Sequence, residues 1–445
     1  MHPYLSHTEG DLKKMLDTIG VSSIDELFKD IPESMRLKNG LDLPKAKSEM
    51  EVRQIVGGLA AKNLTPAFIP SFLGAGVYDH YIPSIIPAIT SRSEYYTAYT
   101  PYQPEVSQGT LQYIFEFQTM ICDLTGMDVA NASVYDQSNA VVEAAIMCAN
   151  VAKKKKIIVS ETLNPSSRAV LKTYAHAQSL EVVTIPHKDG ETDIEKLKSE
   201  MSDDVAAVIV QSPNFFGIIE DAKALGEVAH TGKKTAFVMS VDPISLGILK
   251  KPSELGADVV IGEGQALGIN MSFGGPYLGF MAVKEKFMRK MPGRIVGQTT
   301  DRNGKRCWVM TLTAREQHIR REKATSNICS NQGLNTLAAS IYMCTMGKSG
   351  LQKVATQCIQ KAHYLQKKLE EKGLKLKYNK PFFKEFVVTG LSAEEQSKKL
   401  FEKNIIGGVG MGRFFEDGKN DIMYAVTEKR TKEEMDALAD YLEVK

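Results

Sequence analysis

Residues 257–280, ADVVIGEGQALGINMSFGGPYLGF, place two apolar runs on either side of a glycine-rich loop. The runs VVIGE and YLGFMAV have the length and character of buried strands. The connection between them is too short for the helical crossover that a parallel pair requires, so we expect the second strand to run antiparallel to the first. No lysine occurs between Lys251 and Lys284.

Before this stretch, apolar runs alternate with amphipathic segments from about residue 155. The runs are KIIVS, EVVTIP, VAAVIVQSP and AFVMSVD, and the segments between them include SSRAVLKTYAHAQ and DIEKLKSEM. This alternation predicts a parallel sheet that is covered by helices on both faces. After about residue 320 come a long helical region, the strand-like runs FKEFVVTG and DIMYAVTE, and helices opened by capping boxes at Ser392 and Thr431.

The 445 residues therefore divide into three expected parts. They are a helical arm over 1–60, a large α/β domain over 61–315 and a small α+β domain over 316–445. The composition, 43% hydrophobic and 24% charged with a net charge of +2, gives no reason to expect a nucleic-acid or membrane partner. The six cysteines form no Cys-x-x-Cys pair and fit a reducing cytoplasm better than a disulfide framework or a zinc site.

A helix entry at residues 133–150, SVYDQSNAVVEAAIMCAN, is a candidate phosphate site. Large α/β enzymes that use pyridoxal phosphate bind the cofactor phosphate at such a turn, because free N–H groups and the helix dipole favour an anion there. Ser138 and Asn139 could line that site. They could equally be simple helix caps, and the capping interpretation is the better supported of the two.

Asp242 ends the predicted strand in FVMSVDPISLG. Ligands of open α/β sheets bind at the carboxyl ends of the strands, and a carboxylate there can pair with a pyridinium nitrogen and keep the ring an electron sink. The alternative is that Asp242, directly before Pro243, begins a turn. The sequence alone favours neither interpretation.

The stretch RSEYYTAYTPYQPEVSQG, residues 92–109, combines four tyrosines with Arg92 and two glutamates. Tyrosine hydroxyls and an arginine suit the recognition of a small carboxylate in an apolar pocket. The same residue types are enriched in protein interfaces, and the two roles are compatible.

Basic residues gather in TAREQHIRREKATSNICSN, residues 313–331. Arg315, His318, Arg320, Arg321 and Lys323 could face an anion at a hinge between the domains. Interleaved glutamates favour a solvated helix face for most of them.

Three of these motifs together closely resemble glycine decarboxylase, the P-protein family of the glycine cleavage system. The motifs are RSEYYTAYTPYQPEVSQGTLQYIFEFQT (92–119), TAREQHIRREKATSNIC (313–329) and FGGPYLGF (273–280). The resemblance extends from the arm to the small domain. It is nearest to the subunit 1 form, which is similar to the N-terminal half of single-chain P-proteins.

The resemblance implies a pyridoxal-phosphate-dependent transferase fold of the aminotransferase-like type (fold type I) with a smaller α+β domain. In this family the cofactor lysine lies in the C-terminal half or in subunit 2. Gln265 and Ala266 fall about where that half has its histidine and lysine, and Gln137 replaces a glycine that is usual in N-terminal halves. Ser138, Asn139, Asp242 and Gln265 would then mark a relic pocket, with pyridoxal phosphate on the partner.

The activity implied by the resemblance is glycine decarboxylation. CO2 leaves glycine, and the remaining aminomethyl group passes to the lipoyl arm of H-protein. The expected assembly is an α2β2 heterotetramer with subunit 2 in the prokaryotic cytoplasm, and subunit 1 alone should be inactive. Tyr95 and Tyr96, supported by Arg92 and Glu94, are the residues expected near glycine at a shared interface site.

Two other readings remain open. The chain could be a complete pyridoxal-phosphate enzyme that uses Lys250 or Lys251, although these precede the strand after which the lysine is expected. It could also be a purely structural partner that never touches substrate.

Overall fold

The computed structural model describes residues 4–66 and 68–442, and the chain divides into two compact units, 1–64 and 65–445. The first unit is helical. Its elements are α1 (Glu9–Ile19), α2 (Glu49–Ala60) and two 3₁₀ turns, Ile24–Phe28 and Glu33–Met35. The helix α1 ends at Gly20 in the left-handed conformation.

No described side chain of the helices in this first unit is buried within the chain. Helix α2 exposes Val52, Ile55, Val56 and Leu59, each about half accessible to solvent. Because these positions repeat at helical spacing, they form one apolar stripe along α2.

The second unit is built on a seven-stranded sheet in the order β1-β9-β8-β7-β6-β2-β3. Strands β3, β2, β6, β7 and β8 are parallel, and β9 runs antiparallel to β8. The apolar runs therefore form the predicted strands, and the short glycine-rich connection does produce an antiparallel strand. The bounds are β1 (Val129–Ala130), β2 (Lys156–Ser160), β3 (Glu181–Ile185), β6 (Val205–Gln211), β7 (Ala236–Val241), β8 (Val259–Glu263) and β9 (Gly279–Val283).

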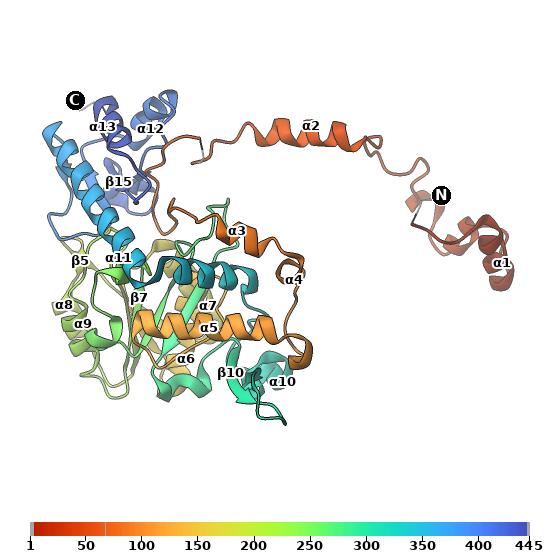
Figure 1. Ribbon diagram of the computed structural model, residues 1–445, viewed down its shortest axis with the longest axis horizontal. Helices are drawn as coiled ribbons and strands as arrows, with labels where there is room; N and C mark the ends of the chain where they lie inside the picture. The colour runs from red at the N-terminus through yellow and green to blue at the C-terminus, as the bar shows by residue number, and fades with distance from the viewer. Residues whose placement is uncertain (1–3, 67, 443–445) are drawn as a thin grey trace. The chain divides into compact units, whose positions relative to one another are not determined.

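Helices cover both faces of this sheet, so its strands are buried on both sides. Successive residues of β6 belong to different cores: Val208 and Val210 pack with α5, α8, α9 and α11, whereas Ala207 and Ile209 pack with α6 and α7. Figure 1 shows α5 and the first half of α11 side by side in front of the sheet. The bounds are α3 (Ile85–Thr90), α4 (Ser93–Tyr96), α5 (Gln108–Thr125), α6 (Gln137–Ala152), α7 (Pro165–Gln178), α8 (Ile194–Glu200), α9 (Ala222–Ala229), α10 (Gln317–Arg320) and α11 (Gly333–Glu371).

A smaller antiparallel sheet follows, in the order β12-β13-β15-β14, with α12, α13 and the end of α11 packed on it. Helix α11 is interrupted at Gly347, whose backbone is not helical. Residues on both sides of the break, 338–343 and 351–358, pack in the core of the large sheet, and residues 362–369 pack on the small sheet. The bounds are β12 (Lys375–Leu376), β13 (Glu385–Thr389), β14 (Val409–Gly410), β15 (Asp421–Ala425), α12 (Ala393–Glu402) and α13 (Lys432–Tyr441).

Two antiparallel ribbons complete the fold. They are β4 (His187–Lys188) with β5 (Glu191–Thr192), and β10 (Ile295–Thr300) with β11 (Arg306–Thr311). Neither ribbon was anticipated from the sequence. Across the described residues, none of the helices combines the length and apolar character needed to span a bilayer.

Candidate functional site

The carboxyl ends of β6, β7 and β8 meet the first turn of α6 at one edge of the large sheet. A cavity of about 30 Å³ remains there, room for only one or two water molecules. Its lining residues come from these elements and the residues just after them, from the segment before α3 and from the start of β13. They include Tyr78, Gln137, Gln211, Asp242, Glu263, Ala266, Lys384 and Glu385. This is the edge at which an open α/β sheet binds its ligand.

Asp242 pairs with a lysine of the small domain. Lys384 is 2% exposed, and its Nζ lies 2.5 Å from Asp242 Oδ2. The other carboxylate oxygen accepts the N–H of Ile244 at 2.8 Å, so Asp242 also begins the turn. Both interpretations of Asp242 thus have a structural counterpart, but the cation beside it belongs to the chain itself.

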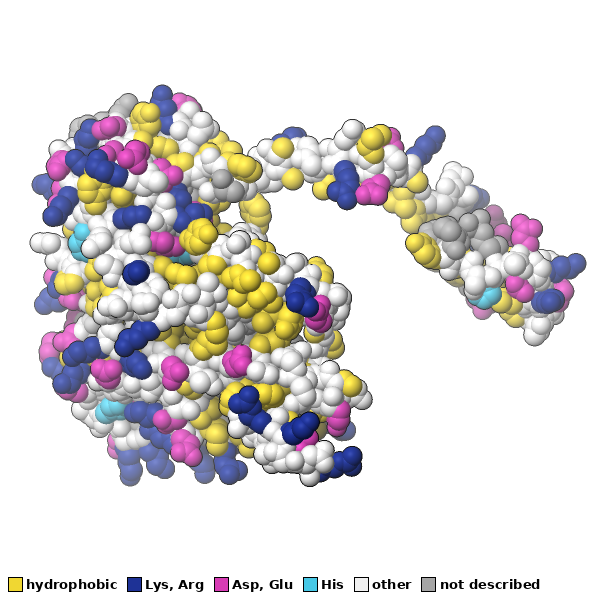
Figure 2. Space-filling model, in the orientation of Figure 1, with side chains coloured by type: hydrophobic (Ala, Val, Ile, Leu, Met, Phe, Trp, Pro, Cys, Tyr) yellow, Lys and Arg dark blue, Asp and Glu magenta, His cyan; other side chains and the backbone are white. Residues whose placement is uncertain are grey.

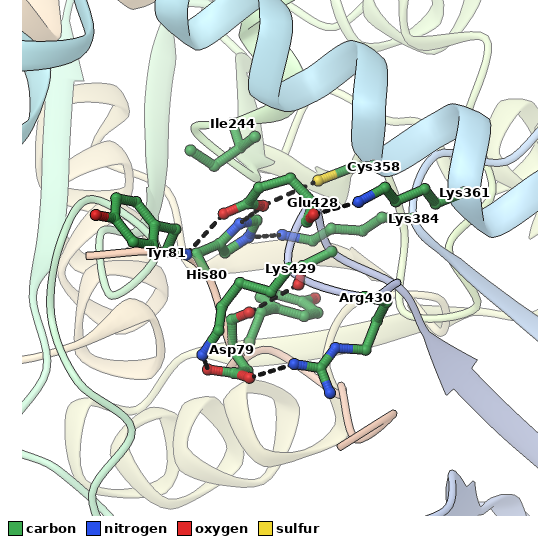
Figure 3. Close-up of polar contacts among 12 residues, drawn as sticks. Asp79, His80, Tyr81, Ile244, Cys358, Lys361, Lys384, Glu428, Lys429 and Arg430 are labelled. Atoms are coloured by element: carbon green, nitrogen blue, oxygen red, sulfur yellow. Dashed lines mark hydrogen bonds and ion pairs between the residues drawn. The ribbon is translucent and has the colours of Figure 1, made fainter. Parts of the chain in front are cut away.

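The Lys384 ammonium is held from two further sides. It lies 3.5 Å from the centre of the Tyr78 ring. It also donates to His80 Nε2 at 3.0 Å, a contact drawn in Figure 3. Since an ammonium only donates, Nε2 accepts, and the ring proton of His80 lies on Nδ1, 2.7 Å from Glu428 Oε2. Lys384, His80 and Glu428 therefore form a buried hydrogen-bonded chain.

His80, Glu428 and the Cys358 thiol lie close enough together to suggest a metal site. Two features oppose that reading. Because His80 Nε2 accepts from Lys384, His80 Nδ1 carries the ring proton and has no lone pair to offer a metal ion. Burial raises the pKa of Cys358, which keeps it a thiol. The cluster is better described as support for the lysine.

Carboxylates occupy the N-terminus of α6. Asp136 Oδ1 accepts the N–H of Asn139 at 2.7 Å, and Glu263 Oε2 accepts the N–H of Gln137 at 3.1 Å. Glu263 also accepts the N–H groups of Gln265 and Leu278, and its burial raises its pKa to about 7.

The helix cap differs from the one expected. Ser138 and Asn139 were predicted as possible caps, but the cap is Asp136, because the chain is extended at that residue and enters the helix at Gln137. Ser138 instead exchanges a hydrogen bond of 3.0 Å with Ser167. The amide of Gln137 donates to Ser240 Oγ at 2.7 Å.

Gln265 is buried and links two backbone segments. Its side chain donates to the carbonyls of Tyr78 and Ile269 and accepts the N–H of Tyr78, all within 3.0 Å. Ala266, which lines the cavity, has no functional group. Pyridoxal phosphate therefore does not fit the residues present. No lysine faces the cavity from the loop after β8. Asp242 is already paired with Lys384, and the first N–H groups of α6 already donate to Glu263 and Asp136.

Lys250 and Lys251 lie far from this edge. Both are exposed and precede β8, whereas the cavity lies where β8 ends. A strand separates them from the cavity, so they cannot replace the missing lysine there.

The tyrosine-rich stretch lies on the surface around α4 and the loop that follows. Tyr96 is 69% exposed, while Tyr95 packs edge-on against Tyr113 with ring centres 6.2 Å apart. Arg92 and Glu94 form an exposed ion pair, with Nε 2.9 Å from Oε1. Figure 2 shows hydrophobic side chains gathered on this face of residues 65–445. Exposed aromatic residues of the unit include Tyr81, Tyr96, Tyr99, Tyr102 and Phe273.

The structure joins this stretch to the basic segment 313–331 through Arg294, a residue that sequence analysis did not select. Arg294 is buried; it lies under the Tyr102 ring and donates to the carbonyl of Cys329 at 2.9 Å. His318 stacks edge-on against the same tyrosine. In the sequence, the one feature that could have pointed to Arg294 is its place directly after the turn Met291-Pro292-Gly293.

Within segment 313–331 the solvated interpretation fits four of the five basic residues, and Arg315 fits neither earlier interpretation. His318, Arg320, Arg321 and Lys323 are exposed, which agrees with a solvated surface. Arg315 is different, because it donates to the carbonyls of Leu312 and Gly293 and holds the backbone together.

The same segment is tied to α6 by a hydrogen bond of 2.9 Å from Ser326 Oγ to Glu143 Oε1. Burial raises the pKa of Glu143 to about 7, and its second oxygen has no hydrogen-bond partner among the described residues.

Comparison with known proteins gives a consistent result. Residues 2–442 match the family described as glycine cleavage system P-protein. A probable glycine dehydrogenase (decarboxylating) subunit 1 from Bacillus cytotoxicus is 56% identical over 99% of this chain and 98% of its own length. The protein of the same name from Bacillus licheniformis is 55% identical over the same shares.

Solved structures agree. A crystal structure of glycine decarboxylase (P-protein) of the glycine cleavage system, in inhibitor-bound form, has a TM-score of 0.89 and 40% identity, covering 98% of each chain. An apo cysteine desulfurase from Thermococcus onnurineus NA1, with a TM-score of 0.62 and 15% identity, covers 89% of this chain and 98% of its own and shares the fold alone. These neighbours confirm the expected fold type I architecture.

Proposed function

The chain belongs to the glycine cleavage system P-protein family, and from this premise we propose that it is the subunit of a glycine dehydrogenase (decarboxylating) that carries no cofactor lysine. Together with subunit 2 it releases CO2 from glycine and passes the aminomethyl group to the lipoyl arm of H-protein, whose disulfide is reduced. The observation that carries this proposal is the end-to-end similarity to relatives named subunit 1.

The cofactor lysine is assigned to subunit 2. In support, Gln265 and Ala266 follow β8 where a lysine would be needed, and Asp242 is already paired with Lys384. Pyridoxal phosphate on the partner supplies the electron sink for decarboxylation. This chain alone is then inactive.

The contribution of this chain is one wall of a shared site, formed by Tyr95, Tyr96, Arg92 and Glu94. Decarboxylation benefits from a pocket that excludes water and holds its polar groups in place. Exposed aromatic side chains around α4 suit that purpose once a second chain covers them. In this proposal they bind and orient glycine, and no proton transfer is assigned to them.

The proposed assembly is an α2β2 heterotetramer that meets H-protein in the prokaryotic cytoplasm. The apolar stripe on α2 supports a partner chain, because exposed apolar surface of this kind marks protein contacts. All six cysteines lie in the described part of the chain as free thiols, in keeping with a reducing compartment.

The test uses the complex of this chain with subunit 2 and lipoylated H-protein. We would measure CO2 release from carboxyl-labelled glycine for Tyr95→Phe and Tyr96→Phe, with assembly checked by light scattering. Tyr174→Phe is the control, because Tyr174 is an exposed tyrosine on α7, outside the tyrosine-rich stretch. We expect a lower rate for Tyr95→Phe or Tyr96→Phe and no change for the control.

Unchanged rates in both variants of an intact complex would favour the second candidate, a structural partner that never touches glycine. Borohydride reduction after addition of pyridoxal phosphate tests the lysine assignment separately. A reduced adduct on subunit 2 supports it, and an adduct on this chain contradicts it.

A further inference from the structure

The two charged ends of a pyridoxal phosphate pocket have recognisable partners. A carboxylate at a strand end faces the pyridinium nitrogen, and the N-terminus of a helix faces the phosphate. In this chain the first position is Asp242 and the second is the first turn of α6, which begins at Gln137. Both lie on the wall of the same small cavity.

At the first position the chain supplies its own cation. Lys384 is buried against Asp242, and the Tyr78 ring and His80 fix the ammonium from two other directions. A lysine with three partners is part of the pocket wall, unlike a flexible surface side chain.

At the second position the chain supplies its own anionic group. The N–H of Gln137 donates to Glu263, which also accepts two other backbone N–H groups. The N–H of Asn139 donates to Asp136. A phosphate arriving here would lose these N–H groups and would meet two carboxylates.

The position of Lys384 is fixed by a close backbone approach. Gly217 has φ +84°, and a Cβ built on it would lie 1.9 Å from the carbonyl oxygen of Glu385. The N–H of Phe383 donates to the carbonyl of Gly217 at 3.0 Å. The loop after β6 and the start of β13 are therefore in direct contact, and this contact delivers Lys384 to the cavity.

We propose that Lys384 and Glu263 are internal replacements for the cofactor: the ammonium takes the place of the pyridinium, and the carboxylate takes the place of the phosphate. The pocket of this chain is therefore closed to pyridoxal phosphate and remains folded without it. This inference concerns the chain's own pocket and stands whether or not the proposed reaction is correct.

The test uses the full-length chain with Lys384→Ala, which removes the cation beside Asp242 in the pocket. The probe is pyridoxine, which keeps the pyridine ring but has no aldehyde to react with surface lysines and no phosphate. We expect Lys384→Ala to bind pyridoxine roughly tenfold or more tightly than the unaltered chain, measured by calorimetry and by the rise in melting temperature. Adding Glu263→Gln should produce a further gain for 4′-deoxypyridoxine 5′-phosphate.

Two controls separate this inference from a general loosening of the protein. Asp242→Asn in the Lys384→Ala background removes the carboxylate that would hold the ring, so the gain should disappear. Lys377→Ala removes a different lysine, one paired with Asp417 and Asp421 away from the cavity, and should produce no gain.

The proposal is overturned if the unaltered chain binds pyridoxine as tightly as Lys384→Ala, or if the gain survives Asp242→Asn. If Lys384→Ala does not fold, the comparison becomes Lys384→Met alone against Lys384→Met with Asp242→Asn. The single variant then leaves a buried carboxylate unpaired, so the double variant should recover folded protein. Failure of the double variant to improve on the single one also overturns the proposal.

Discussion

The pocket at Asp242 and the tyrosine-rich stretch around α4 differ in what their polar groups face. In the pocket, Asp242, Lys384 and Glu263 are paired with groups of the same chain and little space remains. Around α4, Tyr96 and the Arg92–Glu94 pair face solvent. The pocket lies where enzymes of this fold have their active site. The surface around α4, by contrast, has side chains that are exposed and can still bind a ligand.

This difference shows that position in a fold does not by itself identify a working site. A ligand needs unoccupied partners, and a buried group that is already paired offers none. The contribution of this chain is therefore expected at its surface, where a second chain can cover the aromatic side chains.

The largest effect is expected where the pocket is closed by backbone contact. Gly217→Ala should destabilise the chain by about 3–5 kcal/mol or prevent folding, because the new methyl group would overlap Glu385 in a left-handed backbone conformation. Urea denaturation measures this. The control is Gly390→Ala, at φ +92° in open space, which should cost only about 1–2 kcal/mol. Equal losses would mean that the close approach contributes nothing.

A smaller and pH-dependent effect is expected at Glu143, which lies between α6 and the segment 313–331. Its pKa of about 7 in the folded chain is above the ordinary value of 4.5, so its stabilising contribution is complete below pH 4.5 and is lost as the pH rises through 7. Glu143→Gln should match the unaltered chain at pH 4.5 and exceed its stability at pH 8 by at most about 3 kcal/mol.

The measurement is the free energy of unfolding at several pH values. Because other buried carboxylates titrate in both proteins, the informative quantity is the difference between variant and parent. A difference that does not change with pH would contradict the assignment of a raised pKa to Glu143.

Tyr96 should show the opposite pattern, with little effect on the chain and a clear effect on the complex. Tyr96→Ala removes a ring that is 69% exposed, so the stability of the chain alone should change by less than about 0.5 kcal/mol. The reconstituted complex should lose roughly 10- to 100-fold in glycine decarboxylation, or about 1.4–2.7 kcal/mol. A loss of chain stability comparable to the loss of rate would remove the contrast between the two regions.

The smallest effect is expected for the surface ion pair. Arg92→Ala should leave the melting temperature of the chain unchanged, because an exposed pair contributes little to folding. Any loss should appear in the complex, as a higher KM for glycine with the assembly intact. A lower melting temperature would show that Arg92 has a structural role within the chain.

The sequence was sufficient for six of the seven strands of the large sheet, all but the two-residue β1, and insufficient for the pocket. Buried parallel strands are continuous apolar runs, and KIIVS or VAAVIVQ can be read without further context. The β10–β11 ribbon was missed because its strands are mixed in polarity and only partly buried. The predicted cap of α6, Ser138 or Asn139, was wrong by two or three residues, because Asp136, Ser138 and Asn139 are all good capping residues.

The pairing of Lys384 with Asp242 could not be predicted from the sequence. Asp242 follows β7 and Lys384 precedes β13, and the contact between the loop after β6 and the start of β13 helps to bring them together. A lysine within the apolar run PFFKEFVV was visible, but nothing nearby in the sequence supplied its partner. The same holds for Arg294, whose partners lie around residues 102 and 329–331.

The stripe on α2 has a consequence for the life of the protein in the cell. If a second chain covers Val52, Ile55, Val56 and Leu59, as proposed above, then before assembly the N-terminal unit presents a helix with no described buried side chain and with apolar residues facing water. Chaperones and proteases act on such segments. An unassembled copy would be removed faster than an assembled one, so turnover itself would match the amount of this chain to the supply of its partner.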